Sequence, residues 1–176
     1  PKNRYELEAM LDYAYAYDEP IAIRYPRGSA CDVCPEFRSP VVYGKSEMLY
    51  EEQEIAVIFV GHMFEEALEV RKRLKEAGYS CSLINARFVK PLDEELLIQL
   101  AKTHDTVITL EEHVLNGGYG QAADAFYMQH EVDNIHVHNI AIDDCFVEHG
   151  SVKELRKLLG LDAKSVTDVV RSYWNR

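Results

Sequence analysis

Two arginines near residue 25 form the first group whose types and spacing could do chemistry. The stretch Arg24-Tyr25-Pro26-Arg27-Gly28 follows a short apolar run and places two guanidinium groups close together before a glycine. Guanidinium groups hold phosphate through paired, charge-assisted hydrogen bonds, so this stretch is a candidate phosphate-binding site. The alternative is a structural salt bridge in an acidic protein, and the residue chemistry taken alone favours that alternative.

Carboxylates beside histidines form two further groups. Glu112 and His113 follow one predicted strand, and Glu148 and His149 follow another. A carboxylate can tune a neighbouring histidine for acid–base work, and open α/β sheets bind ligands at the edge where parallel strands end. The alternative is a polar loop network or a subunit contact, which we favour, so these four residues are candidates for a loop or interface site.

Three other motifs are better explained by a structural role than by ligand binding. The glycine-rich run at 116–120 lacks the G-x-G-x-x-G spacing of a dinucleotide site, which favours a tight turn with close helix–sheet packing. Cys31 and Cys34 have no second pair for zinc, so we interpret them as two unpaired thiols rather than a zinc or redox pair. His136 and His138 share one face of a strand but have no third ligand. No metal site is therefore predicted.

The elements that must position these residues alternate between strand and helix. A helix over 5–17 and a short strand over 21–25 look like the last α/β unit of a domain, and a lead-in strand over 45–50 follows a linker. The core strands are predicted at 55–60, 81–88, 106–110 and 134–142, with helices from 64 to the glycine at 78, over 92–103 and 118–130, and from 151 and 162 onward. This alternation predicts an α/β fold: a three-layer open sheet, mostly parallel, with one antiparallel strand.

Local signals mark where the last helices begin and end. Ser151 and Glu154 have the S-x-x-E spacing of a capping box, and Gly160 can close that helix. Asp162 can cap the final helix.

The composition of the chain argues against a nucleic-acid-binding or membrane protein. The 176 residues are 47% hydrophobic and carry a formal net charge of -11, which opposes binding to nucleic acid or an anionic membrane. No apolar run approaches the roughly 20 residues of a membrane span. Four scattered cysteines and the lack of a signal-peptide core point to a reducing, cytoplasmic compartment. Since the first residue is proline, we expect processing or a piece of a longer protein.

Four strings spread along the chain resemble one enzyme family. They are IAIRYPRG at 21–28, NARFVKPLD at 85–93, EEHVLNGGYG at 111–120 and FVEHG at 146–150. In this order they resemble the C-terminal region of the 1-deoxy-D-xylulose-5-phosphate synthases, thiamine-diphosphate enzymes of the transketolase superfamily. The resemblance implies a pyrimidine-binding domain tail at 1–30, a linker and lead-in strand at 31–50, and a transketolase-like C-terminal domain at 51–176.

The resemblance also implies a reaction and partners. The full enzymes form homodimers and condense pyruvate with glyceraldehyde 3-phosphate, releasing carbon dioxide, to make a precursor of isoprenoids, thiamine and pyridoxal. They bind thiamine diphosphate and magnesium through a GDG motif in a preceding domain, and this chain contains no GDG. We therefore expect no cofactor binding or catalysis by the chain alone, but an architectural or dimer role. By resemblance Arg27 is the first candidate for the substrate phosphate and Arg24 the second.

Other interpretations remain open at this stage. The C-terminal domain of transketolase itself, or of a 2-oxo acid dehydrogenase beta subunit, has the same fold by resemblance. A free-standing, non-catalytic association module is the alternative from another class. The chain also departs from the family pattern in GHM at 61–63, where a small residue commonly precedes the Met, and in DDCF at 143–146, where an arginine commonly precedes the Phe.

Overall fold

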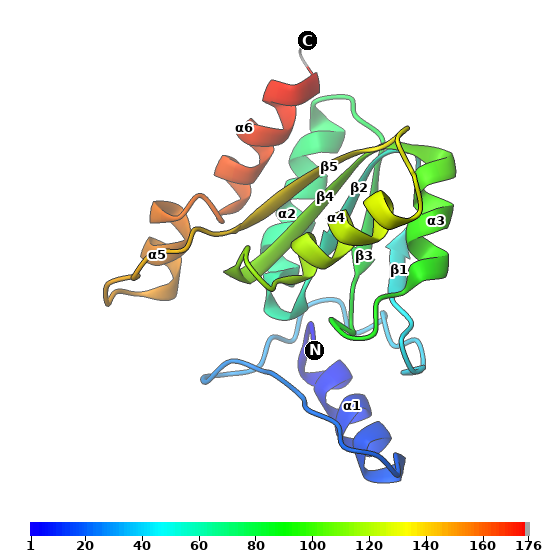
Figure 1. Cartoon of the computed structure of the whole chain (residues 1–176). Coiled ribbons are helices and arrows are strands. Elements are labelled where there is room, and N and C mark those ends of the chain that lie inside the picture. Colours follow the sequence, from blue (N-terminus) through cyan, green and yellow to red (C-terminus); the bar gives the residue numbers. More distant parts are fainter. Residues whose placement is uncertain (175–176) are drawn as a thin grey trace.

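A five-stranded mixed sheet forms the centre of the protein (Figure 1). The computed structural model describes residues 1–174, and the strand order is β1-β3-β2-β4-β5. The strands are β1 (Glu47–Tyr50), β2 (Glu54–Phe59), β3 (Cys81–Asn85), β4 (His104–Val114) and β5 (His136–Ile142). The edge strand β1 pairs antiparallel with β3, and the other neighbours pair parallel. The predicted sheet, mostly parallel with one antiparallel strand, is confirmed.

Helices cover both faces of the sheet and complete the three layers (Figure 1). One face is covered by α2 (Phe64–Glu76) and α6 (Ala163–Trp174), and the other by α3 (Glu94–Thr103) and α4 (Tyr119–Gln129). The remaining helices are α1 (Arg4–Ala16), the short 3-10 helix η1 (Gly61–Met63) and α5 (Val152–Leu158). No helix in the described part of the chain has the length and apolar character that crossing a membrane requires.

The central strand β2 supplies both hydrophobic cores. Ile55, Val57 and Phe59 point into the core beneath α2 and α6. Ala56 and Ile58 point into the core beneath α3 and α4, because successive side chains of a strand face opposite sides. All five are fully buried, as expected for a parallel strand covered on both faces.

Helix ends follow the local signals in the sequence. Asp93 caps α3 by accepting from the Leu96 N–H, so this helix begins two residues later than predicted. The capping box of Ser151 and Glu154 is present in full, which confirms that prediction. The Asp162 carboxylate accepts from the N–H groups at the start of α6 and confirms its predicted cap.

The predicted strand over 21–25 is wrong, and several other strand ends differ from the prediction, most of all the C-terminal ends of β3 and β4. After α1, residues 17–46 contain no helix or strand, because a strand forms only against a neighbour and 21–25 has none within the described chain. The predicted strand over 81–88 ends at Asn85, since Arg87 adopts a left-handed φ of 59°. The strand predicted over 106–110 extends to Val114, because β5 continues to pair with it.

Truncation of a core side chain tests this architecture. Leu83 of β3 is fully buried in the core beneath α2, whereas Leu11 of α1 is 52% exposed. Leu83→Ala should lower the free energy of unfolding by about 2–5 kcal/mol, because it removes buried methyl groups and leaves a cavity. Leu11→Ala is the matched control and should cost less than about 1 kcal/mol. Urea unfolding measures both, and equal losses would contradict the placement of Leu83.

Candidate functional site

The first candidate site lies where the strand order of the sheet reverses, between β2 and β4. From β2 the chain moves through α2 to β3 on one side, whereas β4 and β5 lie on the other side of β2. Open α/β sheets bind ligands in the crevice at such a reversal, beyond the carboxyl ends of the strands. His62, in η1 directly after β2, and Glu112, near the end of β4, occupy this position.

An ion-pair cluster lies at this edge of the sheet. His62 Nε2 lies 2.6 Å from Glu112 Oε2, and Arg156 Nη2 of α5 lies 3.5 Å from the same oxygen. Arg156 also approaches Glu66 of α2 at 3.6 Å. Burial opposes ionisation of Glu112, but the hydrogen bond and charge of His62 and the charge of Arg156 outweigh it and lower the pKa of Glu112. The cluster therefore holds η1, β4 and α5 together by charges of the chain itself.

The two predicted phosphate ligands lie beside this cluster. Arg24 Nη2 donates a 2.9 Å hydrogen bond to the backbone carbonyl of Glu112, so the structure brings these two predicted residues together. Arg27 is exposed and makes no hydrogen bond or ion pair within the described residues. Neither guanidinium is taken up by a salt bridge to a carboxylate within residues 1–174. The phosphate role of Arg27 and Arg24 stays a prediction.

The remaining candidates from the acid–histidine motifs lie apart from the cluster. His113 Nδ1 lies 2.7 Å from the carbonyl oxygen of Val114. Glu148 and His149 are exposed in the loop after β5, without a hydrogen bond or ion pair in the part of the chain described. Their loop or interface role stays a prediction. Sequence reasoning missed His62 and Arg156: the unusual GHM string marked His62, and no sequence signal marked Arg156.

The glycine-rich run is explained by an internal carboxylate. Glu111, which is 2% exposed, accepts hydrogen bonds from the backbone N–H groups of Tyr119 at 2.9 Å and Gly120 at 2.8 Å. A Cβ on Gly118 would lie 2.6 Å from Glu111 Oε1, and one on Gly120 would lie 2.5 Å from an Asn139 side-chain oxygen. The Glu111 carboxylate thus compensates the positive N-terminal end of α4. The close packing around Glu111 and Asn139 requires the glycines, as predicted from the sequence.

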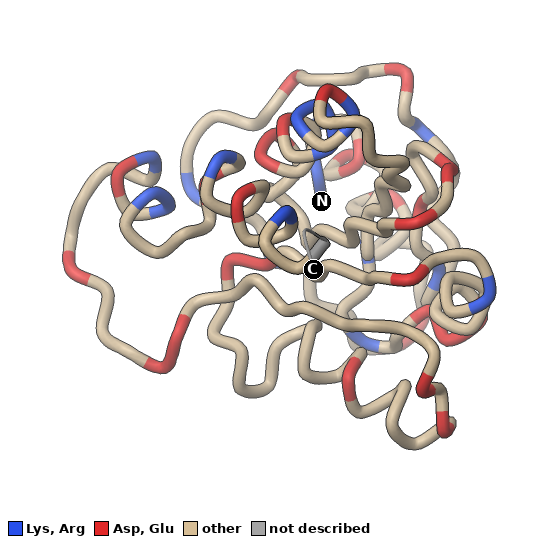
Figure 2. The backbone as a smooth tube through the Cα atoms, turned by 90° about the horizontal axis from the view of Figure 1, so that it is seen from above, with Lys and Arg blue, Asp and Glu red and all other residues tan. Residues whose placement is uncertain are grey.

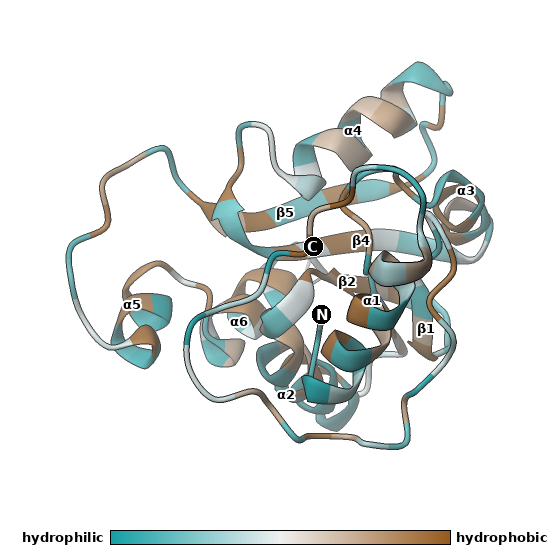
Figure 3. Ribbon diagram, turned by 90° about the horizontal axis from the view of Figure 1, so that it is seen from below, coloured by the Kyte–Doolittle hydropathy of each residue, from teal (hydrophilic) through white to brown (hydrophobic). Residues whose placement is uncertain are grey.

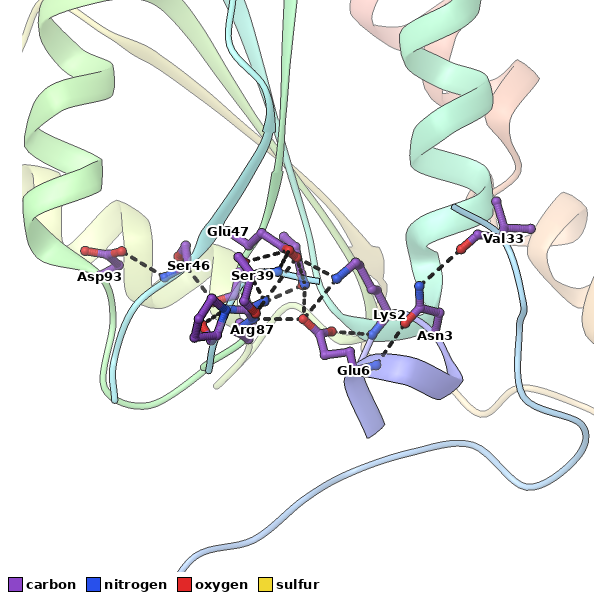
Figure 4. Close-up of polar contacts among 12 residues, drawn as sticks. Lys2, Asn3, Glu6, Val33, Ser39, Ser46, Glu47, Arg87 and Asp93 are labelled. Atoms are coloured by element: carbon purple, nitrogen blue, oxygen red, sulfur yellow. Dashed lines mark hydrogen bonds and ion pairs between the residues drawn. The ribbon is translucent and has the colours of Figure 1, made fainter. Parts of the chain in front are cut away.

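A second polar cluster lies where α1 meets the sheet (Figure 4). Lys2 Nζ lies 2.6 Å from Glu47 Oε2 and 3.3 Å from Glu6 Oε1. Arg87 Nε lies 2.8 Å from Glu6 Oε1, and Arg87 Nη2 lies 3.2 Å from Glu47 Oε2. Each of these four charged side chains is at most 5% exposed. With the Asn85 side chain, which donates to Glu6 at 2.7 Å, they form what we call the junction network.

The junction network also holds the linker. Ser39 Oγ donates to Glu47 at 2.7 Å, and Arg87 donates to the backbone carbonyls of Ser39 at 3.1 Å and Pro40 at 2.9 Å. Burial opposes ionisation of Glu6, but the charges of Lys2 and Arg87 outweigh it, so the pKa of Glu6 lies below its ordinary value. The network therefore joins α1, the linker and the sheet into one body.

Metal-binding residues do not gather at either cluster. Within residues 1–174, no group of three or more His, Cys, Asp or Glu side chains is placed to hold a metal ion. All four cysteines are free, with Cys31 and Cys34 half-buried in the linker. His138 stacks on Tyr173 with ring centroids 3.7 Å apart, while His136 is exposed.

Comparison with known proteins identifies the fold. Residues 44–166 match the family described as "Transketolase, C-terminal domain". The chain belongs to this family. The split gene transketolase, solved as an inactive beta4 tetramer, superimposes on this transketolase C-terminal domain protein with a TM-score of 0.88 at 27% identity, over 98% of this chain and 55% of its own. The Campylobacter jejuni transketolase, at 19% identity and a TM-score of 0.53 over 73% of this chain and 18% of its own, shares the fold.

The resemblance to one enzyme family within this group is confirmed. The 1-deoxy-D-xylulose-5-phosphate synthase of Lachnoclostridium phytofermentans is 44% identical over 170 residues, which are 97% of this chain and 27% of that protein. The synthase of Syntrophus aciditrophicus is 38% identical over 176 residues, which are 99% of this chain and 27% of its own. The chain thus spans about a quarter of these relatives and corresponds to a C-terminal part of them.

The low pKa of Glu6 gives this transketolase C-terminal domain protein a testable dependence on pH. A carboxylate whose pKa is lower in the folded state stabilises the fold above its unfolded pKa, and that contribution is lost as the pH falls through the folded pKa. Glu6→Gln should therefore cost about 3–5 kcal/mol at pH 7, by leaving Lys2 and Arg87 short of a buried partner, and this cost should shrink below about pH 4.

Urea unfolding of the wild type and variant between pH 7 and pH 3 measures this effect. Glu8→Gln is the matched control, because Glu8 is exposed on the same helix. A Glu6 variant with the same pH profile as the Glu8 variant would contradict the role of the junction network.

Proposed function

We propose that this chain is the C-terminal part of a 1-deoxy-D-xylulose-5-phosphate synthase. The observation that carries the proposal is the 44% identity to such a synthase over 170 residues, on both sides of the linker. The junction network supports it, since Lys2 and Glu6 from the first part share a buried charge cluster with Glu47 and Arg87 from the second. The identity to the two solved transketolases is lower, at 27% and 19%.

The whole enzyme, on this proposal, condenses pyruvate with glyceraldehyde 3-phosphate in the cytoplasm and feeds isoprenoid and thiamine synthesis. Thiamine diphosphate with magnesium supplies the electron sink for this class of reaction. Because the chain contains no GDG motif, we assign both to the remainder of the longer protein and derive no step through them. The chain alone is then inactive, with an architectural role and a homodimer as its assembly. The similar split gene transketolase, described as an inactive beta4 tetramer, supports the inactivity of the chain alone and its association with further copies.

The chain's own contribution to catalysis is to hold the acceptor substrate. Arg27 is exposed and unpaired within the described residues, so its five donors are available to a phosphate. Arg24 lies three residues earlier and is anchored to the carbonyl of Glu112, which fixes its direction. Together the two guanidinium groups orient the phosphate of glyceraldehyde 3-phosphate and so position its aldehyde.

Substitution of Arg27 in the full-length enzyme tests this role. Arg27→Ala should raise the KM for glyceraldehyde 3-phosphate about 10–100-fold, because a charge-assisted phosphate contact is lost. The KM for pyruvate should stay unchanged, as should kcat/KM for unphosphorylated glyceraldehyde. Lys102→Ala, at an exposed cation on α3, is the control and should have no effect. An equal loss with glyceraldehyde would rule out a phosphate contact.

Calorimetry tests where the cofactor binds. Titration of thiamine diphosphate with magnesium into this chain should give no binding heat, whereas the full-length enzyme should bind both. Saturable binding by the chain would overturn the assignment of the cofactor to the remainder of the protein.

A further inference from the structure

The end of β4 is irregular at the place where Arg24 contacts it. β4 pairs with β2 no further than Leu110, and its register against β5 shifts between Leu110 and Val114. Residues 111–113 therefore bulge from the regular ladder, and bulges beside functional sites commonly re-aim a residue. Glu112 lies in the middle of this bulge, and its backbone carbonyl accepts the 2.9 Å hydrogen bond of Arg24.

Side chains from two other elements hold this bulge. The Glu112 carboxylate lies 2.6 Å from His62 Nε2 of η1 and 3.5 Å from Arg156 Nη2 of α5. The helix α5 lies beyond the carboxyl ends of β4 and β5 (Figures 1 and 3) and carries charges of both signs (Figure 2). Arg156 is its buried residue, and a 3.4 Å hydrogen bond to the carbonyl of His62 closes the cluster. The place of Glu112 is thus fixed from both η1 and α5.

The guanidinium of Arg24 depends on this bulge for its direction. Arg24 belongs to the stretch 17–46, which forms no helix or strand, and its side chain is exposed. Within the described residues the carbonyl of Glu112 is its one hydrogen-bond partner, so its other N–H donors are open to a ligand. A guanidinium that is already oriented loses less side-chain freedom when it binds a phosphate.

We propose that His62, Glu112 and Arg156 are positioning residues for the phosphate of the acceptor substrate. The inference rests on the proposed function and deepens it, because it names the residues that hold Arg24 ready for a phosphorylated acceptor. None of the three needs to touch the phosphate, since together they fix the carbonyl that orients the Arg24 guanidinium. When the cluster is broken, Arg24 must be ordered as the substrate binds, and the affinity for a phosphorylated acceptor falls.

Kinetics of the full-length enzyme test this role. His62→Ala and Glu112→Ala keep the backbone carbonyl of residue 112 but remove the ion pair, so each should raise the KM for glyceraldehyde 3-phosphate about three- to tenfold. The KM for pyruvate and kcat/KM for unphosphorylated glyceraldehyde should not change, and His62→Gln, which retains an N–H donor, should restore most of the loss. Glu52→Gln is the matched control, because it breaks ion pairs with Arg71 and Lys75 at the opposite edge of the sheet. Equal losses with both acceptors would overturn the proposal.

A double-mutant cycle with Arg24 shows whether the cluster acts through that residue. Arg24→Ala alone should raise the KM for glyceraldehyde 3-phosphate at least about tenfold, because a charge-assisted phosphate contact is lost. In the Arg24→Ala background, His62→Ala should raise the KM no further, because the side chain that it positions is gone. The same fold-increase with and without Arg24 would overturn the proposal, and so would an Arg24→Ala variant whose KM is unchanged.

NMR of the arginine side chains in this chain tests the coupling without the reaction. Rotation about the guanidinium bonds should be slower in Arg24 than in the exposed Arg27, because Arg24 is hydrogen-bonded. His62→Ala should raise the Arg24 rate toward that of Arg27 and leave the Arg27 rate unchanged. An Arg24 rate that is the same in wild type and variant would overturn this inference, whereas a full-length wild type that forms no 1-deoxy-D-xylulose 5-phosphate would overturn the proposed function.

Discussion

The junction network is the constraint on which the rest of the structure depends. It takes two carboxylates and two cations out of water at the point where α1, the linker and the sheet meet. Such charges are tolerated only when every partner is present, because an unpaired buried charge is strongly destabilising. The segment before the linker must therefore stay packed on the transketolase C-terminal domain, because the buried charges of each need the other as partners. This segment contributes only α1 as regular structure.

Charges of the chain itself also occupy the carboxyl edge of the sheet, where α/β folds commonly hold ligands. Glu111 neutralises the N-terminus of α4, and Glu112 pairs with His62 and Arg156. Both glutamates lie near the end of β4 but face different partners, because successive residues of a strand point in opposite directions. This edge of the sheet is therefore occupied by hydrogen bonds and ion pairs of the chain itself.

The proposed phosphate site uses a side chain that the internal networks leave unused. Arg27 is exposed and unpaired within the described chain. Arg24 and Arg156 both contact Glu112, Arg24 at its backbone carbonyl and Arg156 at its carboxylate. The ion-pair cluster of His62, Glu112 and Arg156 therefore lies beside the proposed phosphate site.

Local patterns in the sequence determined much of this protein. Apolar runs and caps predicted the sheet and helices, and a capping box or a buried parallel strand is decided by neighbours a few residues apart. The tertiary structure alone decided the junction network, which joins Glu6 to Arg87 across 81 positions. It alone also decided the ion-pair cluster in which His62 and Arg156 meet Glu112. It also decided that 21–25 forms no strand here. Ion pairs and strand pairing depend on which distant segments meet, and that is set only when the whole chain packs.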